Sequence, residues 1–235
     1  MPPVRALSAF AVGAATAVVV LALAVAPFLT PAWVGFEQQR SGAEAWTHFA
    51  PADLRHATDA ILSDLVLGPP AFDIVVDGLP VLTEREREHM GDVRGVFAGF
   101  YALAGICAAV VGAAAIAARG SMHRRVWFWK SVRRGATGLA VGVVGIAIVA
   151  VLAFDAAFAV FHQVFFSPGS YTFDPLTDRI VQLFPDAFWF ETSLVVGAVV
   201  FVLPIGLRRL AGGRIGRPAR EVGRDPLQAR AAGAR

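Results

Sequence analysis

The sequence predicts an all-α, polytopic membrane protein with four transmembrane helices and a structured extracytoplasmic cap formed by its first and third loops. Hydrophobic residues make up 56% of the 235 residues, and charged residues make up 17%. Ordinary soluble domains are roughly 45–50% apolar and about 25% charged. The apolar residues also gather in four blocks, each long enough to cross a hydrocarbon core of about 30 Å. We place the spans at about residues 6–28, 93–118, 135–160 and 188–207.

The first block follows Arg5, and it can be interpreted as a cleaved signal peptide or as a permanent membrane span. Its apolar run is longer than the roughly 7–15 residues of a signal-peptide core, which favours an uncleaved helix. Pro27 and Pro31 mark its end.

The first outer loop, residues 30–92, is rich in acids, with eleven Asp and Glu against four Lys and Arg between Glu37 and Asp92. Residues 52–67 place five apolar side chains on one helical face, which predicts an amphipathic helix packed on the bundle or lying at the membrane surface: Leu54, Ala57, Ile61, Leu62 and Leu65. Residues 72–82 are typical of a short extended segment with a turn at Asp77-Gly78.

The second span has a clear helix start. Thr83 and Glu86 have the spacing of a capping box, in which each side chain bonds the backbone N–H of the other residue. A helix is therefore expected from about Glu84. On it, His89 and Asp92 are three residues apart and share a face at the membrane boundary.

Charge predicts the orientation. Residues 119–134 contain six Lys and Arg residues and no acid, whereas Arg179 is the only Lys or Arg in residues 161–187. By the positive-inside rule, both termini are cytoplasmic and the loops 30–92 and 161–187 face outward. Residues 1–210 form the membrane domain, and residues 211–235 are expected to be a disordered basic cytoplasmic tail. Anionic lipid headgroups explain the basic segments better than nucleic acid does.

The third loop, from Phe161 to Trp189, is long, aromatic and polar at once. Loops of this length are uncommon and usually functional. Its Phe and Trp content is unlike that of a disordered tether, so we expect a structured cap that holds part of a polar site.

Two histidines, His89 and His162, stand at the outer ends of the second and third spans. These spans are antiparallel neighbours joined by a short loop, so the two side chains should converge. Ionisable groups near a bilayer are costly and mark functional sites by default; Asp155, seven residues before His162, is another. Three interpretations remain open for this cluster: acid–base catalysis, a metal site with a carboxylate, or a structural polar network.

The sequence lacks the motifs of several common enzyme classes. HExxH, GxSxG, a P-loop and a helix-opening GxGxxG are all absent from the sequence. The single cysteine, Cys107, lies in an apolar block and is expected to be a packing residue. His48, His56 and His123 are expected to be surface residues, and no metal or cofactor is expected.

Two segments resemble the bacterial lipoprotein intramolecular transacylase family, Lit. One opens the second span with an E-x-x-H-x-x-D-V run: Glu86, His89, Asp92 and Val93. The other runs from residue 161 to 190 and carries an aromatic-His motif, a D-P-x-T-D turn and an aromatic ending: Phe161, His162, Phe165, Phe166, Asp174, Pro175, Thr177, Asp178, Leu183, Phe184, Pro185, Phe188 and Trp189. The sequence departs from the family pattern at residues 168–171 of this segment and in the first outer loop.

The resemblance implies an acyltransferase of the bacterial cytoplasmic membrane. It would move an acyl chain from the glycerol ester to the α-amine of a lipoprotein's N-terminal diacylglyceryl-cysteine, at the outer membrane–water boundary. The substrate amine is the nucleophile, so no Ser or Cys is needed. The partners implied are lipid and the diacylated lipoprotein N-terminus.

The expected catalytic residues are His89 and His162 as the acid–base pair, Asp92 or Asp178 to orient an imidazole, and Arg179 near the developing charge. The expected substrate-binding residues are Glu86, Phe165, Phe166, Tyr171 and Asp174. Two alternatives remain: a non-enzymatic membrane protein that binds lipid or a protein partner, and a metal-dependent membrane hydrolase.

Overall fold

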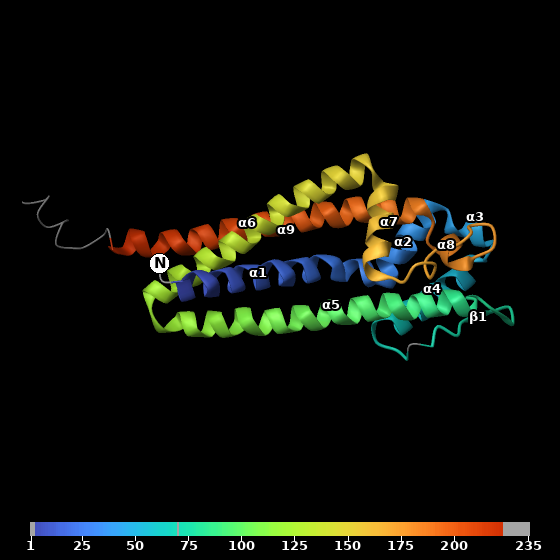
Figure 1. The fold of residues 1–235 in the computed structure, drawn as a ribbon, viewed down its shortest axis with the longest axis horizontal. Helices are drawn as coiled ribbons and strands as arrows, with labels where there is room; N and C mark the ends of the chain where they lie inside the picture. Colours follow the sequence, from blue (N-terminus) through green and yellow to red (C-terminus); the bar gives the residue numbers. More distant parts are fainter. Residues whose placement is uncertain (1–2, 70, 223–235) are drawn as a thin grey trace, which may run out of the picture. The chain divides into compact units, whose positions relative to one another are not determined.

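The computed structural model describes residues 3–69 and 71–222. Within them the chain is mostly helical, with one short antiparallel hairpin (Figure 1). The helices are α1 (Pro3–Val25), α2 (Pro31–Ser41), α3 (Ala43–Thr47), α4 (Pro51–Val66), α5 (Glu84–Ala117), α6 (Met122–Leu152), α7 (Phe154–Phe165), α8 (Arg179–Leu183) and α9 (Asp186–Val222). Two 3-10 turns, η1 (Ala26–Leu29) and η2 (Ala118–Gly120), follow α1 and α5, and the hairpin strands are β1 (Val75–Val76) and β2 (Leu79–Pro80).

Four helices of the described chain are long and apolar enough to cross a membrane, as predicted: Val4–Leu29, Glu84–Gly120, Met122–Val149 and Asp186–Ile215. Most side chains in the apolar parts of α5, α6 and α9 are not buried by the protein. This is expected of helices whose outer faces contact lipid.

Contacts divide the chain into two units. The first contains the described residues 3–21, 103–144 and 200–222, and the second contains residues 22–102 and 145–199. The core of the first unit is small and lies among four helices: Val12, Ala118, Phe128, Val132 and Ala211. There α1 and α6 approach so closely that a Cβ on Gly135 would overlap the backbone of Gly13.

The second unit holds the larger core. The apolar face predicted for residues 52–67 is the buried face of α4, and it packs with the hairpin, the first turns of α5 and α8. Figure 1 shows α2, α3, α4, α8 and the hairpin gathered around the beginning of α5. The hairpin turns at Asp77 and Gly78, both with positive φ, as a two-residue mirror-image turn requires.

Three boundaries differ from the sequence-based expectation. The third span does not run unbroken to residue 160, because the helix breaks at Ala153 and α7 follows as a separate helix. The region expected to be disordered from residue 211 is helical as far as Val222, because α9 extends that far, and residues 223–235 lie outside the described residues. The loops of residues 30–92 and 161–187 also contain α2, α3 and α8, which the sequence did not predict.

Packing explains the break at Ala153. The ring of Phe154 makes an edge contact with Phe190 at 5.3 Å, and Phe158 lies 6.0 Å from Trp189. These contacts seat α7 against the first turns of α9, and aromatic pairs of this kind stabilise a junction beyond the area they bury. The sequence has no Pro or Gly at the break, so the break could not be predicted from a helix-breaking residue.

Candidate active site

The two histidines predicted to converge do lie together in the second unit. His89 stands in the second turn of α5, and His162 stands near the end of α7. Their ring centroids are 6.2 Å apart, and the ring planes differ by 19°. Residues 73 positions apart in the sequence therefore present two imidazoles to the same small volume.

His89 is buried among aromatic rings. It is 6% exposed, with Phe166 at 4.8 Å and Phe173 at 5.4 Å between centroids. Its Nδ1 atom has no hydrogen-bond partner among the described residues. A buried polar atom without a partner is costly, so this atom can gain from a bond to an incoming polar group.

The imidazole of His162 is held in one tautomer. Its Nδ1 lies 2.8 Å from the backbone carbonyl oxygen of Phe158, one helical turn earlier. A carbonyl oxygen only accepts, so Nδ1 carries the hydrogen. In the neutral ring, Nε2 is then the unprotonated nitrogen, ready to accept a proton.

An aromatic box surrounds the pair. Phe158 and Tyr171 lie 4.2 and 5.3 Å from the His162 ring, and Phe166 contacts both imidazoles. Of the expected substrate-binding residues, Phe166 and Tyr171 contact the histidines, whereas Phe165 is exposed and its ring makes a tilted contact with the ring of Phe161.

Two residues of this box, Phe158 and Phe173, were missed in the sequence. The spacing of Phe158, four residues before His162 on a helix, could have indicated it. Phe173 lies in an irregular segment that carries no such signal.

Glu86 is a buried clamp rather than an exposed ligand. It is 0% exposed, and its Oε2 accepts hydrogen bonds from the backbone N–H and the hydroxyl of Thr83, at 2.7 and 2.8 Å. Its Oε1 accepts from the N–H of Ile180 at 2.7 Å. One carboxylate thus caps α5 and ties it to α8, one turn before His89. This geometry favours a positioning role over the expected contact with substrate.

Asp178 also bonds within the protein. Its Oδ2 accepts from the Arg85 guanidinium at 2.8 Å and from the N–H of Asp174 at 2.7 Å. Arg85 lies in turn over the ring of Phe173, at 4.9 Å. Asp174 is exposed, and its Oδ1 accepts from the N–H of Leu176 at 2.9 Å. Asp178 therefore shapes the α7–α8 segment, and no hydrogen bond joins it to either imidazole within the described structure.

Arg179 joins two elements of the cap. Its Nη1 donates to the carbonyl oxygen of Thr47 at 3.0 Å and to Gln182 at 2.7 Å, and the guanidinium covers the ring of Phe49. These contacts link α8 to the end of α3. The remaining expected residue, Asp92, is exposed one turn after His89 on α5.

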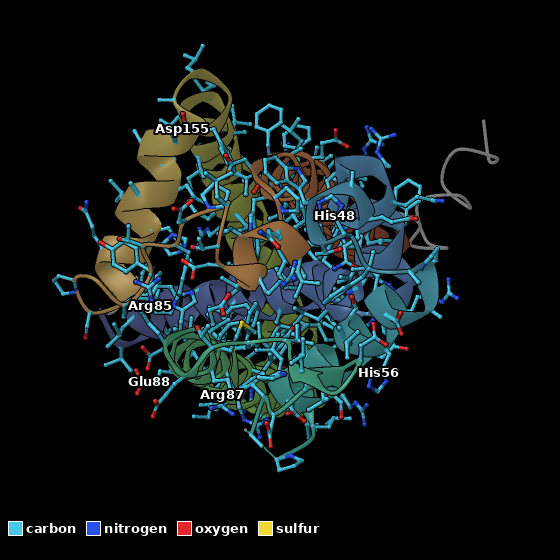
Figure 2. All side chains as sticks on the ribbon, turned by 90° about the vertical axis from the view of Figure 1, so that its right-hand side faces the viewer. His48, His56, Arg85, Arg87, Glu88 and Asp155 are labelled. Carbon is cyan, nitrogen blue, oxygen red and sulfur yellow. The ribbon has the colours of Figure 1, made fainter. Side chains whose placement is uncertain are left out.

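Other candidate groups lie away from the pair. Figure 2 shows Asp155 at the end of α7 that is farther from Arg85, and His48 and His56 on the α3 and α4 side of the cap. Asp155 and His56 are exposed. Among the described residues, no three His, Cys, Asp or Glu side chains are grouped so that they could hold a metal ion.

Comparisons with known proteins agree on one family. The family model for lipoprotein intramolecular transacylase Lit matches residues 10–189. The solved structure of the membrane-integral lipoprotein intramolecular transacylase Lit from Bacillus cereus matches with a TM-score of 0.76 at 16% identity, covering 94% of this chain and all of that one. A structure of the same protein with one histidine replaced by arginine matches with a TM-score of 0.71 at 14% identity, covering 93% and 95%.

No curated protein matches the chain in sequence. At these identities the structural likeness shows the fold, and it confirms the predicted all-α membrane architecture. The family model covers well over half of the chain. The chain therefore belongs to the lipoprotein intramolecular transacylase family, Lit.

Proposed function

We propose that this protein transfers an acyl chain from the glycerol ester to the α-amine of a lipoprotein's N-terminal diacylglyceryl-cysteine. The observation that carries the proposal is the pair of imidazoles in an apolar aromatic box, one of them held as a base. Family membership supports the reaction class.

The reaction balances within one substrate. The amine nitrogen attacks the ester carbonyl carbon, a C–N bond forms, and the glycerol C–O bond breaks. The nitrogen loses a proton and the leaving glycerol oxygen gains one. The products are an amide and a free hydroxyl, so the lipid becomes a lyso-lipid. Because amine and ester belong to one molecule, holding them in register makes the step effectively unimolecular.

His162 is the base in this scheme. Its Nδ1–H is engaged by the Phe158 carbonyl, so Nε2 is the atom that takes the amine proton. The same nitrogen can then return that proton to the glycerol oxygen as the C–O bond breaks. One positioned imidazole thus serves both half-reactions.

His89 stabilises the charge that develops during the reaction. Its apolar surroundings favour the neutral ring, which has one N–H to donate and one nitrogen to accept. We assign that N–H to the ester oxygen that gains negative charge, because a donor in a water-poor site stabilises such charge strongly. Asp92, one turn later and exposed, attracts the substrate ammonium, which releases one proton to water to give the attacking amine.

The remaining residues bind or position. The box around Phe166 and Tyr171 takes the acyl chain near its ester end, and exposed Phe165 extends this apolar surface. Glu86, Asp178 and Arg179 hold the cap around the imidazoles through the bonds described above. By the charge distribution, this site faces outward at the membrane boundary and both termini are cytoplasmic.

The test is expression in a bacterial host that lacks lipoprotein N-acylation, with mass spectrometry of lipoprotein N-terminal peptides. The wild-type chain is expected to yield the N-acylated lyso-form. His162→Ala and His89→Ala should each reduce it by roughly 10²–10⁴-fold. His56→Ala, which removes an exposed histidine of the same unit, is the matched control and should retain full activity.

Different outcomes identify the alternatives. Unchanged product from His89→Ala and His162→Ala would remove their catalytic assignment. No lyso-form from a well-expressed wild-type chain would favour a non-enzymatic role, in which these substitutions lower stability alone. Activity abolished by a chelator and restored by added metal would favour a metal-dependent hydrolase.

A further inference from the structure

A groove lies between α1 and α6 within the first unit. Its volume is about 370 Å³, within the range of about 300–1,000 Å³ that is usual for small-molecule sites. Its α1 wall is made of Phe10 and small side chains between Ala6 and Ala17. Its α6 wall is made of Gly138, Leu139 and their neighbours, with Arg134 at the edge. The groove is therefore apolar apart from one cation.

The groove is built into the helix crossing. Gly13 and Gly135 allow the two backbones to touch, since a Cβ on Gly135 would overlap the Gly13 backbone. Gly138, one turn further along α6, has open space where its Cβ would be. The crossing point closes the floor of the groove, and the missing side chain at Gly138 leaves it open to the outside.

Arg134 forms no ion pair with an acid among the described residues. Its side chain is exposed, and no hydrogen bond or ion pair joins it to the described residues. Residues 3–21, 103–144 and 200–215 contain no Asp or Glu at all. They contain ten cations: Arg5, Arg119, Arg124, Arg125, Lys130, Arg133, Arg134, Arg208, Arg209 and Arg214. None of these residues supplies a counter-charge to Arg134.

We propose that the α1–α6 groove binds an anionic glycerophospholipid, with an acyl chain along the groove and the phosphate at Arg134. Both helices belong to candidate membrane spans, so the molecule that reaches this surface is lipid. Basic pockets between transmembrane helices recognise anionic headgroups, and an arginine fork suits a phosphate better than a zwitterion already neutralised by its own ammonium. A second copy is a poorer occupant, because two such faces would bring unpaired cations together.

This site is separate from the histidine pair, which lies in the other unit. None of its residues takes part in the proposed acyl transfer, so the two proposals can fail independently.

The headgroup arm of the test uses native mass spectrometry of the purified full-length protein, mixed with equal amounts of phosphatidylglycerol and phosphatidylcholine. Wild type should retain phosphatidylglycerol preferentially. Arg134→Gln should reduce that preference by about fivefold, because the contact between its guanidinium and the lipid phosphate is lost. Arg133→Gln is the matched control, because it removes the same charge from an exposed neighbour that does not line the groove, and it should leave the preference unchanged.

The acyl arm uses Gly138→Phe, which fills the groove, against Gly142→Phe, which adds the same ring to an open position outside it. Only Gly138→Phe should lower retention of both phospholipids. Thermal unfolding of each variant confirms that it is folded.

Three results would overturn the proposal. Equal losses from Arg134→Gln and Arg133→Gln would mean a diffuse electrostatic effect. Release of the retained phosphatidylglycerol by inorganic phosphate, with no effect of Gly138→Phe, would mean an anion site without an acyl groove. A change from dimer to monomer in Gly138→Phe, with lipid retention intact, would mean that a second copy occupies the groove.

Discussion

At the scale of single residues, the hydrogen bond from His162 to the Phe158 carbonyl gives a prediction that separates base from scaffold. Asn carries an amide N–H near the position of Nδ1 but nothing at Nε2. His162→Asn should therefore retain the bond to Phe158 and a thermal midpoint near that of wild type, while acyl transfer falls roughly 10²–10⁴-fold. The measurement is lyso-form yield by mass spectrometry alongside thermal unfolding in detergent.

His162→Gln is the companion variant, because its amide group reaches towards Nε2 rather than Nδ1. It should lose activity equally and also lose the bond to Phe158, which lowers its thermal midpoint. An active His162→Asn protein would show that Nε2 is not the base.

Glu86 supports a second residue-scale prediction. Glu86→Gln keeps the size of the side chain but turns one buried acceptor into a donor that faces an N–H group. We expect unfolding to become easier by about 1–3 kcal/mol and kcat to fall, because the cap shifts near His89. Glu88→Gln, an exposed carboxyl on the same helix (Figure 2), is the matched control and should change neither quantity. Equal behaviour of the two variants would remove the positioning role.

The candidate site was only partly predictable from these residues. The capping-box motif predicted the contact between Thr83 and Glu86, because both residues lie within one helical turn. The contact between Glu86 and Ile180 spans 94 residues, and no local pattern encodes such a pairing. The convergence of His89 and His162 was predictable because helix ends at one membrane face share a depth, whereas the partners of Asp178 and Arg179 depended on loop packing.

At the scale of elements, the crossing of α1 and α6 depends on a glycine. Gly135→Ala places a methyl group against the Gly13 backbone, and overpacking of this kind costs about 1–3 kcal/mol. Gly138→Ala adds the same methyl group to open space and should change the thermal midpoint little. Thermal unfolding of both variants in the same detergent gives the comparison; equal midpoints would mean that the crossing is not tightly packed.

The sequence predicted a helix well where one face of that helix contacts lipid or the protein core along its whole length. The four apolar blocks and the α4 face follow from hydrophobic periodicity alone. The break at Ala153 could not be predicted in this way. An apolar run has the same pattern whether the helix continues or breaks so that Phe154 can pack on Phe190. The extension of α9 through a Gly-, Ala- and Arg-rich segment was likewise hidden by a composition that suggested disorder.

The junction of α2 with α9 predicts a pH dependence. Glu37 on α2 is 1% exposed, and Arg40 pairs with Glu191 of α9 at 2.8 Å. Burial raises the pKa of Glu37 above its usual range, and the hydrogen bond and negative charge of Glu191 raise this pKa further, against the opposing charge of Arg40. The folded protein therefore keeps a proton on Glu37 up to a higher pH than the unfolded chain does.

The sign follows from proton linkage. This stabilisation is complete below the unfolded pKa, near the ordinary value of 4.5, and is lost as pH rises through the higher folded pKa. Glu37→Gln mimics the protonated carboxyl, so it should equal wild type in stability near pH 4 and exceed it at neutral pH. Thermal midpoints across that range test this, with the exposed Glu44→Gln as control; parallel curves for wild type and Glu37→Gln would contradict it.

At the scale of the whole molecule, charge is segregated along the chain. Residues 37–92 carry eleven acids, whereas residues 103–144 carry none and hold six cations. The acid-rich part includes His89 and Asp92 of the proposed acyl-transfer site, and the basic part supplies Arg134 and the α6 wall of the proposed lipid groove. By the positive-inside rule, this distribution predicts the orientation in the membrane, and it favours a cationic ligand in the acid-rich region and an anionic ligand in the basic region.

That orientation can be tested directly, because Cys107 is the single cysteine of the chain and Cys107→Ala leaves a cysteine-free background. In it, Glu88→Cys adds a thiol beside the proposed active site, and Arg124→Cys adds one to the basic segment; both positions are exposed. A membrane-impermeant maleimide added to intact cells, with the outer membrane permeabilised, should label only Glu88→Cys. After the inner membrane is disrupted, both should react. Labelling of Arg124→Cys in intact cells would invert the topology and place the histidine pair on the cytoplasmic side, where acyl transfer to an exported lipoprotein could not occur.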